Sequence, residues 1–313
     1  MNFSLHHVTN KDGVRLRYGI SPPSRDNLDA YVLILQGRGE YIERYQETAE
    51  DLTQRGLGCV TFDFRGQGGS DRATSDPIMG YIKDVMEYVS DTACIMAHIK
   101  DQHDITCQML LTHSTGGLVA MKMLLSQPDL WKSVVMLAPF FGMGGPDWLA
   151  LAAQFLSASL CRYGFDQQYL PGQKALSPLN AFEPENLLTS DAERYARNVA
   201  LLTAKPDLVI GGVSAGWLDA CFRTQANLMG KLAAPADAMS LPPITMVLAG
   251  NDQVVSNTTT NDLFGNHPNV TMCEIPEARH EILQEQDYLR DQFWAAFDLH
   301  VSRHHAEWLS TAG

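Results

Sequence analysis

One serine stands where a predicted strand turns directly into a predicted helix. Ser114 follows a short apolar run and precedes a segment with helical spacing. Such a turn holds a serine hydroxyl above the end of a sheet, and Gly116 and Gly117 supply the small residues that the crowded backbone needs. The turn also directs the backbone N–H of Thr115 toward a substrate oxygen. Ser114 is therefore a candidate nucleophile for attack on a carbonyl, although a serine here could instead only cap the helix.

A serine hydroxyl needs a histidine to take its proton, and that histidine needs a carboxylate to orient it. Asp252 follows the predicted strand 244–249, and His280 follows the predicted strand 270–275. Carboxyl ends of parallel strands meet at one edge of a sheet, so both side chains are expected at the edge that holds Ser114. We predict Asp252 and His280 as the orienting acid and the general base. His113, beside the serine, is predicted to be structural.

The predicted strand 31–35 ends in a glycine-rich loop, Gln36-Gly-Arg-Gly-Glu40. In a serine hydrolase site of this arrangement, the loop after this strand gives a second backbone donor for the oxyanion. By position that donor is the N–H of Arg38. The alternative is an ordinary glycine-rich turn. The loop lacks the GxGxxG spacing of a dinucleotide site.

The elements that must position these residues alternate between strand and helix. Strands are predicted at residues 14–18, 31–35, 59–64, 109–112, 134–137, 244–249 and 270–275, and helices at 45–54, 79–99, 118–125 and 288–300. This alternation predicts an α/β fold with a mostly parallel sheet covered on both faces. Residues 142–241 interrupt this alternation of strands and helices, and contain predicted helices at 149–156, 192–202 and 217–232. We predict a core formed by residues 1–141 and 242–313, with residues 142–241 as a helical cap.

Composition narrows the classes of partner. The chain has 313 residues with 45% apolar and 19% charged residues, and its formal net charge is −13. So acidic a surface repels phosphate backbones, which argues against a nucleic-acid partner. No stretch reaches the ~20 apolar residues of a membrane helix, and no signal peptide is visible. Six scattered cysteines and the lack of zinc-ligand spacing predict reduced thiols, a cytoplasmic location, and no metal or other cofactor. The oligomeric state stays open.

Five motifs in this order resemble the α/β-hydrolases of the monoacylglycerol lipase and lysophospholipase L2 type, grouped with the serine aminopeptidase-like hydrolases. The motifs are QGRGE at 36–40, DFRGQGGS at 63–70, HSTGG at 113–117, AGNDQVV at 249–255 and ARHEILQE at 278–285. Segments 187–198 and 211–218 are similar to the cap of the lysophospholipase L2 branch. Two residues depart from the family pattern. Gln36 stands where a histidine is usual, and Thr112 stands where the serine turn usually begins with glycine.

The resemblance implies a serine ester hydrolase acting on a small, lipid-like ester of a hydrophobic acyl group. The predicted residues of the acyl pocket are apolar side chains near or within the cap: Phe140, Phe141, Met143, Trp148 and Trp217. Arg194, one helical turn from Arg197, is a candidate for binding an anionic head group, unless both pair with nearby acids within the cap. The alternatives are an aminopeptidase of the same fold and a non-catalytic ligand-binding protein.

Overall fold

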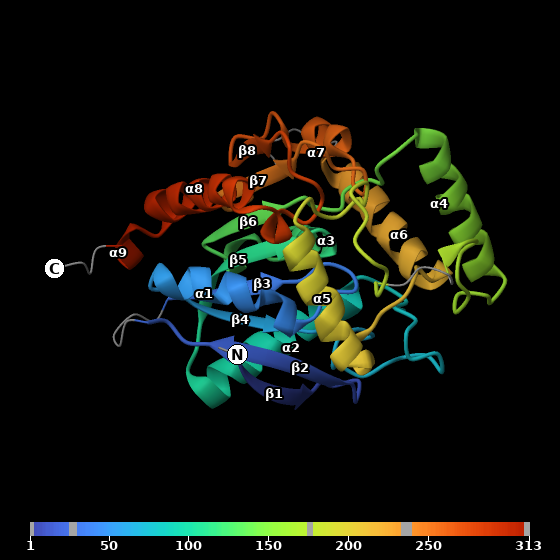
Figure 1. Ribbon diagram of the computed structural model, residues 1–313, viewed down its shortest axis with the longest axis horizontal. Helices are drawn as coiled ribbons and strands as arrows, with labels where there is room; N and C mark the ends of the chain where they lie inside the picture. The colour runs from blue at the N-terminus through green and yellow to red at the C-terminus, as the bar shows by residue number, and fades with distance from the viewer. Residues whose placement is uncertain (1–2, 25–29, 174–177, 233–239, 310–313) are drawn as a thin grey trace.

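A single eight-stranded sheet organises the chain (Figure 1). The computed structural model describes residues 3–24, 30–173, 178–232 and 240–309. The strands are β1 Ser4–Thr9, β2 Arg15–Ser21, β3 Tyr31–Leu35, β4 Gly58–Phe62, β5 Cys107–His113, β6 Ser133–Leu137, β7 Ile244–Ala249 and β8 Val270–Ile275. Their order across the sheet is β1-β2-β4-β3-β5-β6-β7-β8. The pairs β1–β2 and β2–β4 are antiparallel and the others are parallel. The predicted α/β fold with a mostly parallel sheet is confirmed.

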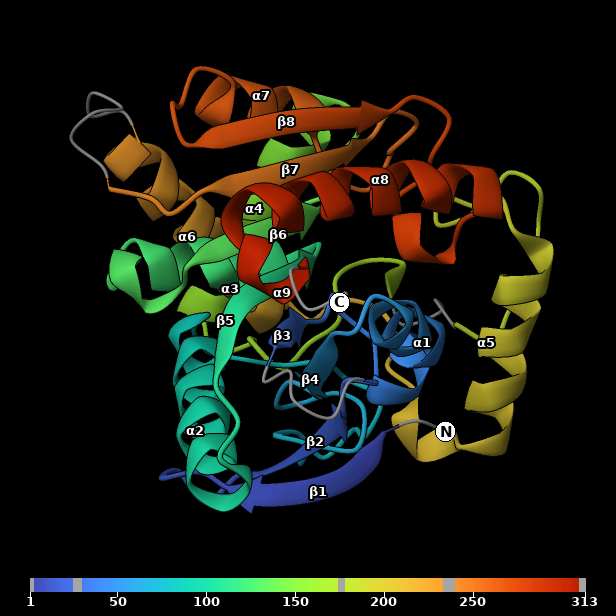
Figure 2. The same cartoon turned by 90° about the vertical axis from the view of Figure 1, so that its left-hand side faces the viewer.

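The central strands are buried on both faces, as their continuous apolar runs predict. Every residue of β3, β4, β6 and β7 is buried. The side chains of the sheet divide between two apolar clusters, one on each face. Figure 2 shows α2 Met86–His103, α3 Thr115–Leu124 and α6 Ala215–Leu232 covering one face, with α1 Gln46–Gln54 and α8 Asp287–His304 on the other.

The helices that cover the sheet are α1 Gln46–Gln54, α2 Met86–His103, α3 Thr115–Leu124, α7 Asn257–Phe264, α8 Asp287–His304 and α9 Ala306–Leu309. The prediction for residues 79–99 began the helix too early. The side chains of Met79, Ile82 and Val85 are buried, which gave the segment its helical spacing, but Asp84 accepts the N–H of Met86 at 2.9 Å and α2 begins there.

Strand β1 and helices α7 and α9 were not predicted. Strand β1 is an edge strand with only partly buried and exposed side chains, so its sequence lacks the apolar run that marked the central strands. Helix α7 is short and polar, and its start depends on Ser256, whose hydroxyl accepts the N–H of Thr259. Such short elements give weak signals in a sequence.

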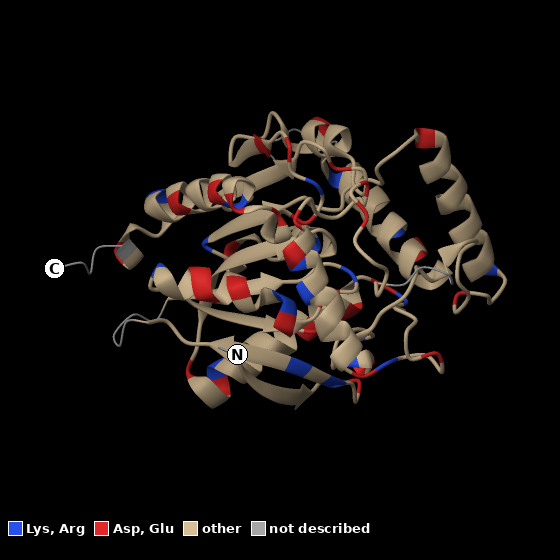
Figure 3. Cartoon of the chain, in the orientation of Figure 1, with Lys and Arg blue, Asp and Glu red and all other residues tan. Residues whose placement is uncertain are grey.

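Three longer helices connect β6 to β7: α4 Asp147–Arg162, α5 Ala192–Ala204 and α6 Ala215–Leu232. Residues 174–177 and 233–239 of the predicted cap lie outside the described residues. Helix α4 packs along α6 and carries charge only near its ends (Figure 3). Its outer face exposes Trp148, Leu151 and Phe155 by 68%, 64% and 76%. Among the described residues, no helix is both long enough and apolar enough to cross a bilayer.

Candidate active site

Ser114 occupies a strained turn between β5 and α3. Its φ of 50° and ψ of −113° lie where residues other than glycine rarely fall. The turn brings the start of α3 against the sheet. A Cβ added at Gly116 would lie 2.1 Å from the carbonyl oxygen of Leu35, and one at Gly117 would lie 2.8 Å from the Cβ of Pro139. These two glycines therefore allow the close approach that exposes the serine hydroxyl above the sheet.

The structure brings Ser114, Asp252 and His280 together from three strand ends. Nε2 of His280 lies 3.0 Å from Oγ of Ser114, and Nδ1 of His280 lies 2.8 Å from Oδ2 of Asp252. Asp252 follows β7 and His280 follows β8, while Ser114 follows β5. All three residues are at least largely buried. The distances allow a continuous hydrogen-bonded relay from the carboxylate to the serine hydroxyl.

The surroundings of Asp252 keep it ionised. Burial alone would raise the pKa of this carboxyl, but hydrogen bonding and attraction from His280, together with the N–H groups of Val254 and Val255, outweigh burial and lower the pKa. An ionised Asp252 accepts only, so Nδ1 of His280 must donate to it. Nε2 of the neutral imidazole is then free to accept the proton of Ser114.

A second buried group of side chains holds the histidine loop from behind. His113 lies with Nδ1 3.1 Å from Oε1 of Glu40 and Nε2 3.1 Å from the carbonyl oxygen of His280. Burial alone would lower the pKa of His113, but the charge and hydrogen bond of Glu40 outweigh it and raise the pKa. Both partners are acceptors, so the protonated imidazole satisfies both. His113 thus links Glu40 to the backbone of His280, in keeping with the structural role predicted for it. The sequence analysis did not identify the contribution of Glu40.

Glu40 closes the glycine-rich loop on itself. Its carboxylate accepts the N–H of Gly37 and, at 2.6 Å, the hydroxyl of Tyr45. Glu40 is the last residue of the QGRGE motif, and its position in the motif could have predicted this contact. A carboxylate three residues beyond the first glycine can reach back to an N–H left free by the turn, as in a helix cap. Glu40 therefore fixes the shape of the loop that contains Arg38.

The two predicted oxyanion donors lie beside the relay. Arg38 and Thr115 line the same cavity as Ser114 and His280. Thr115 is the first residue of α3, where an N–H has no partner within the helix. That N–H is available to a ligand at the positive end of the helix. The assignment of both N–H groups as oxyanion donors stays a prediction.

The two departures from the family motifs lie in the core, behind the site. Gln36 is fully buried, and its Nε2 donates to Oγ1 of Thr61 at 3.1 Å and to Oδ1 of Asp63 at 3.4 Å. Thr112 is also fully buried. Oε1 of Gln36 and Oγ1 of Thr112 have no hydrogen-bond partner in the described part of the chain. Both substitutions therefore change the packing beneath the loop and the serine turn, and neither replaces a member of the relay.

A cavity of about 720 Å³ opens over the relay. Three of the predicted pocket residues, Phe140, Met143 and Trp217, line it. The rings of Phe140 and Trp217 stack with centroids 6.1 Å apart. Helix α4 adds Leu149, Ala152, Ala153 and Leu156 to the wall. The cavity is therefore apolar over much of its surface, and Ser114, Thr115 and His280 are among the polar residues that line it.

Two other predicted pocket residues lie away from this cavity. Phe141 is almost fully buried and packs its ring 5.0 Å from that of Phe264 under α7. Trp148 points outward from the start of α4 and is 68% exposed. The sequence places both near the insertion, but the direction of each side chain depends on how the backbone leaves β6.

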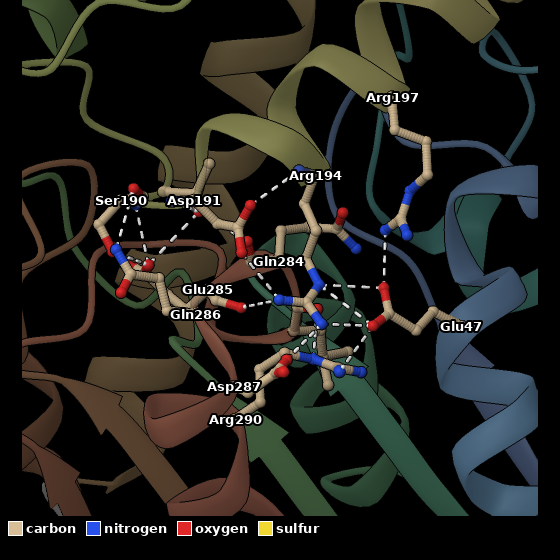
Figure 4. A network of polar contacts seen from close by, with 12 residues as sticks. Glu47, Ser190, Asp191, Arg194, Arg197, Gln284, Glu285, Gln286, Asp287 and Arg290 are labelled. Atoms are coloured by element: carbon tan, nitrogen blue, oxygen red, sulfur yellow. Dashed lines mark hydrogen bonds and ion pairs between the residues drawn. The ribbon is translucent and has the colours of Figure 1, made fainter.

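Arg194 also lies outside the cavity, in a network of ion pairs (Figure 4). Its Nε lies 3.0 Å from Glu47 of α1, and its Nη1 lies 2.8 Å from Asp191. Arg197 and Arg290 also bind Glu47, at 2.7 and 2.8 Å. Arg194 and Arg197 both pair with acids, as the second interpretation predicted, but only Asp191 belongs to the predicted cap. Glu47 and Asp287 belong to α1 and α8 of the core, so the network joins α5 to these helices.

The family model Hydrolase_4, described as serine aminopeptidase S33, matches residues 26–287. The chain belongs to this hydrolase family. It is 27% identical over 286 residues to lysophospholipase L2 of Escherichia coli K12, covering 89% of this chain and 82% of that protein. It is 25% identical to the probable lysophospholipase L2 of Haemophilus influenzae, covering 92% and 88% of the two chains.

Solved structures share the fold of this hydrolase at low identity. A soluble variant of monoglyceride lipase from Saccharomyces cerevisiae superposes with a TM-score of 0.78 at 17% identity, covering 97% of this chain and 96% of that chain. A thermostable carboxyl esterase from Bacillus coagulans gives 0.72 at 16% identity, covering 97% and 99%. The predicted resemblance, the α/β-hydrolase fold and the hydrolase class are confirmed.

Proposed function

We propose that this family member is a serine ester hydrolase with Ser114 as nucleophile, His280 as general base and Asp252 as orienting acid. One observation carries the proposal: contacts of 2.8 and 3.0 Å join the three side chains in a line that ends at the floor of an apolar cavity. This arrangement has the parts that acyl transfer requires, namely a nucleophile, a base in contact with it and an oriented tautomer of the base.

In the proposed reaction, Oγ of Ser114 attacks the ester carbonyl carbon while Nε2 of His280 takes the hydroxyl proton. The N–H groups of Arg38 and Thr115 hold the resulting oxyanion, each donor contributing about 3 kcal/mol. The intermediate expels the alcohol, which receives its proton from His280. Water, deprotonated by the same imidazole, then attacks the acyl-enzyme and releases the acid and the free serine.

The proposed substrate is an ester of a hydrophobic acyl group. The apolar walls of the cavity favour an acyl chain, and the polar groups at the floor favour a scissile carbonyl held at Ser114. The similarity to lysophospholipase L2 proteins supports a lipid-like ester. We also propose that residues 142–241 act as a cap, because α4 and α6 supply much of the cavity wall. The cytoplasmic location stays a prediction.

Reaction with a fluorophosphonate tests the nucleophile. We expect the wild-type chain to be labelled at Ser114 and the Ser114→Ala variant to remain unlabelled. Ester hydrolysis should fall by roughly 10⁴-fold or more in that variant. A folded wild-type chain that ignores the probe and binds acyl ligands would support a non-catalytic binding protein instead.

A substrate panel tests the reaction class. It should contain p-nitrophenyl esters, monoacylglycerols, lysophospholipids and aminoacyl amides. We expect turnover of the esters and little or none of the amides. Faster cleavage of aminoacyl amides than of any ester would replace the proposal with an aminopeptidase of the same fold.

A further inference from the structure

The side chain of Arg38 lies in the wall of the cavity. It leaves the loop whose N–H is the proposed oxyanion donor and reaches across to the predicted cap. There Nη2 donates to the carbonyl oxygens of Gly211, at 2.7 Å, and of Gly212. The guanidinium lies over the ring of Trp217, 5.3 Å from its centroid. Trp217, Gly211 and Gly212 all line the cavity together with Arg38.

Arg38 carries a positive charge that no nearby carboxylate of the described residues balances. The titratable groups around it are Tyr88, Cys221 and Tyr169, whose pKa values are raised by burial, so they are uncharged at neutral pH. Burial lowers the pKa of Arg38, although a guanidinium remains protonated. Nε is buried and has no hydrogen-bond partner in the described part of the chain.

Other buried arginines of this protein are paired with acids. Arg17 binds Glu43 and Asp63 at 2.8 and 2.6 Å, and Arg65 binds Asp91 at 2.6 Å. Burying a guanidinium without a carboxylate is costly, because attraction to a counter-ion does not offset the lost hydration. Arg72 and Arg279 also donate only to carbonyl oxygens, but they do not line the cavity. Of the two arginines that line it, Arg44 pairs with Glu281, and Arg38 has no carboxylate partner among the described residues.

The remaining charges at the cavity compensate one another. Arg44 pairs with Glu281 and lies 3.8 Å from Glu40, which also holds His113. Asp252 is not among the residues that line the cavity, and its carboxylate accepts from His280, Val254 and Val255. Arg38 is then a cation at the cavity for which the described residues supply carbonyl acceptors but no carboxylate, and a ligand with an anionic group would supply the missing negative charge.

The chemistry of a guanidinium suits a phosphate. Its planar set of N–H donors matches the oxygens of a phosphate, and the hydrogen bonds are charge-assisted. A phosphate on an acylated glycerol lies only a few bonds from the ester carbonyl. The guanidinium and the proposed oxyanion donor belong to the same residue, and that residue lines the cavity with Ser114. The phosphate of an ester held at Ser114 would meet the guanidinium by lying toward Gly211, Gly212 and Trp217.

We propose that Arg38 is a specificity residue that favours esters bearing a phosphate near the scissile carbonyl over neutral esters of the same acyl chain. The inference rests on the proposed ester hydrolase function and deepens it by naming the charge of the substrate. Carbonyl hydrogen bonds and ring stacking alone would make Arg38 a structural residue, and such a role would affect charged and neutral esters alike.

The test compares two variants of similar side-chain length, Arg38→Lys and Arg38→Met. Both lose the planar fork, but only the lysine keeps the charge. The substrates are a lysophosphatidylglycerol and a monoacylglycerol with the same short acyl chain, each below its micelle concentration. The readout is the ratio of kcat/KM for the two substrates, because either variant also alters the loop that holds the proposed oxyanion donor.

We expect Arg38→Met to lower this ratio by roughly tenfold or more, and Arg38→Lys, which keeps the charge but loses the fork, to lower it by a smaller factor of about threefold. Arg223→Met is the matched control, because Arg223 is an exposed arginine paired with Asp219 and Asp84, and its loss should leave the ratio unchanged. Circular dichroism and fluorophosphonate labelling establish that each variant is folded and has a reactive serine.

Two results would overturn the inference. An unchanged ratio in Arg38→Met would mean that the charge of Arg38 does not distinguish phosphate-bearing esters from neutral ones. Equal loss of the ratio in the lysine and methionine variants would assign the effect to the shape of the loop. Failure of the ester hydrolase proposal has a different signature, since the wild-type chain would then hydrolyse neither ester.

Discussion

At the scale of single residues, the site depends on groups that restrict one another. Asp252 holds one nitrogen of His280, the serine hydroxyl contacts the other, and His113 holds the carbonyl of the same histidine. A relay of this kind needs little reorganisation during reaction, because its partners are already oriented. Changes at one atom are therefore expected to affect rate more than folding.

The Asp252→Asn variant tests the orienting role. The new amide would keep an oxygen for the N–H groups of Val254 and Val255, which now bind Oδ1 of Asp252 at 2.8 and 3.0 Å. Its NH₂ group would favour the wrong tautomer of His280, so kcat should fall by roughly 10⁴-fold. Steady-state kinetics measure the loss, and an unchanged melting temperature provides the control. A variant retaining more than about a tenth of wild-type kcat would argue against this role.

Gly116→Ala tests the packing of the serine turn. The new Cβ would meet the carbonyl oxygen of Leu35 at 2.1 Å, so we expect a loss of about 3 kcal/mol in the free energy of unfolding. Gly230→Ala is the matched control, because Gly230 also lies in a helix but an added Cβ there meets nothing within 4 Å. The control should gain about 0.5 kcal/mol. Urea unfolding measures both, and equal effects would contradict the packing argument.

At the scale of elements, ion pairs join the insertion to the core beside the histidine loop. Glu47 of α1 accepts from Arg194 and Arg197 of α5 and from Arg290 of α8 (Figure 4). The segment before α5 also contacts the histidine loop directly, since the N–H of Glu281 donates to the carbonyl oxygen of Leu188 at 2.8 Å. Helix α5 is thus held by ion pairs in addition to the apolar cluster that contains Leu202 and Tyr41.

The pH dependence of stability tests this ion-pair network. Burial would raise the pKa of Glu47, but the hydrogen bonds and charges of the arginines outweigh it and lower the pKa from 4.5 to about 2. A depressed carboxyl pKa stabilises the fold above the unfolded value, and this stabilisation is lost as pH falls from 4.5 toward 2. Glu47→Gln should therefore cost about 2 kcal/mol at neutral pH.

Measuring the free energy of unfolding across that range checks the sign. The difference between the wild type and Glu47→Gln should shrink as pH falls. Glu50→Gln, on the exposed side of the same helix, should have little effect at any pH. A difference that is independent of pH would assign the effect to something other than the carboxylate charge.

At the scale of the whole molecule, the cavity exists because the predicted cap meets the core. Its wall combines loops after the strands with α4 and α6, so no single element forms a binding site. Helix α4 presents one face to this cavity, while Leu151 and Phe155 on its other side are exposed. The proposed acyl site is therefore a property of the assembled chain.

Filling the cavity from α4 should shorten the accepted acyl chain. Ala153→Trp adds volume at the wall, so we expect kcat/KM for p-nitrophenyl palmitate to fall by roughly tenfold or more relative to the butyrate ester. Leu151→Trp is the matched control, because Leu151 is 64% exposed on the same helix. A similar chain-length profile in both variants would place the acyl chain elsewhere.

Much of the architecture could be predicted because its signals are local. The apolar runs of β3, β7 and β8 matched their predicted bounds, and short motifs at strand ends located Ser114, Asp252 and His280. Parallel strands carry their carboxyl ends to one edge, so the order of the motifs was enough to predict that these residues meet. Strand β1 was missed because its polar sequence, SLHHVT, contains no apolar run, and none of its side chains is fully buried.

Sequence patterns alone were sufficient for the fold class, the hydrolase family and the three residues of the relay, since each depends on a few neighbouring residues. The packed chain was needed to learn that Arg194 pairs with Glu47, that Trp148 faces outward, and that Arg38 lies at the cavity without a carboxylate partner among the described residues. The physical reason is that the partners of a charged or apolar side chain come from distant segments, and their approach is fixed only when the whole chain packs.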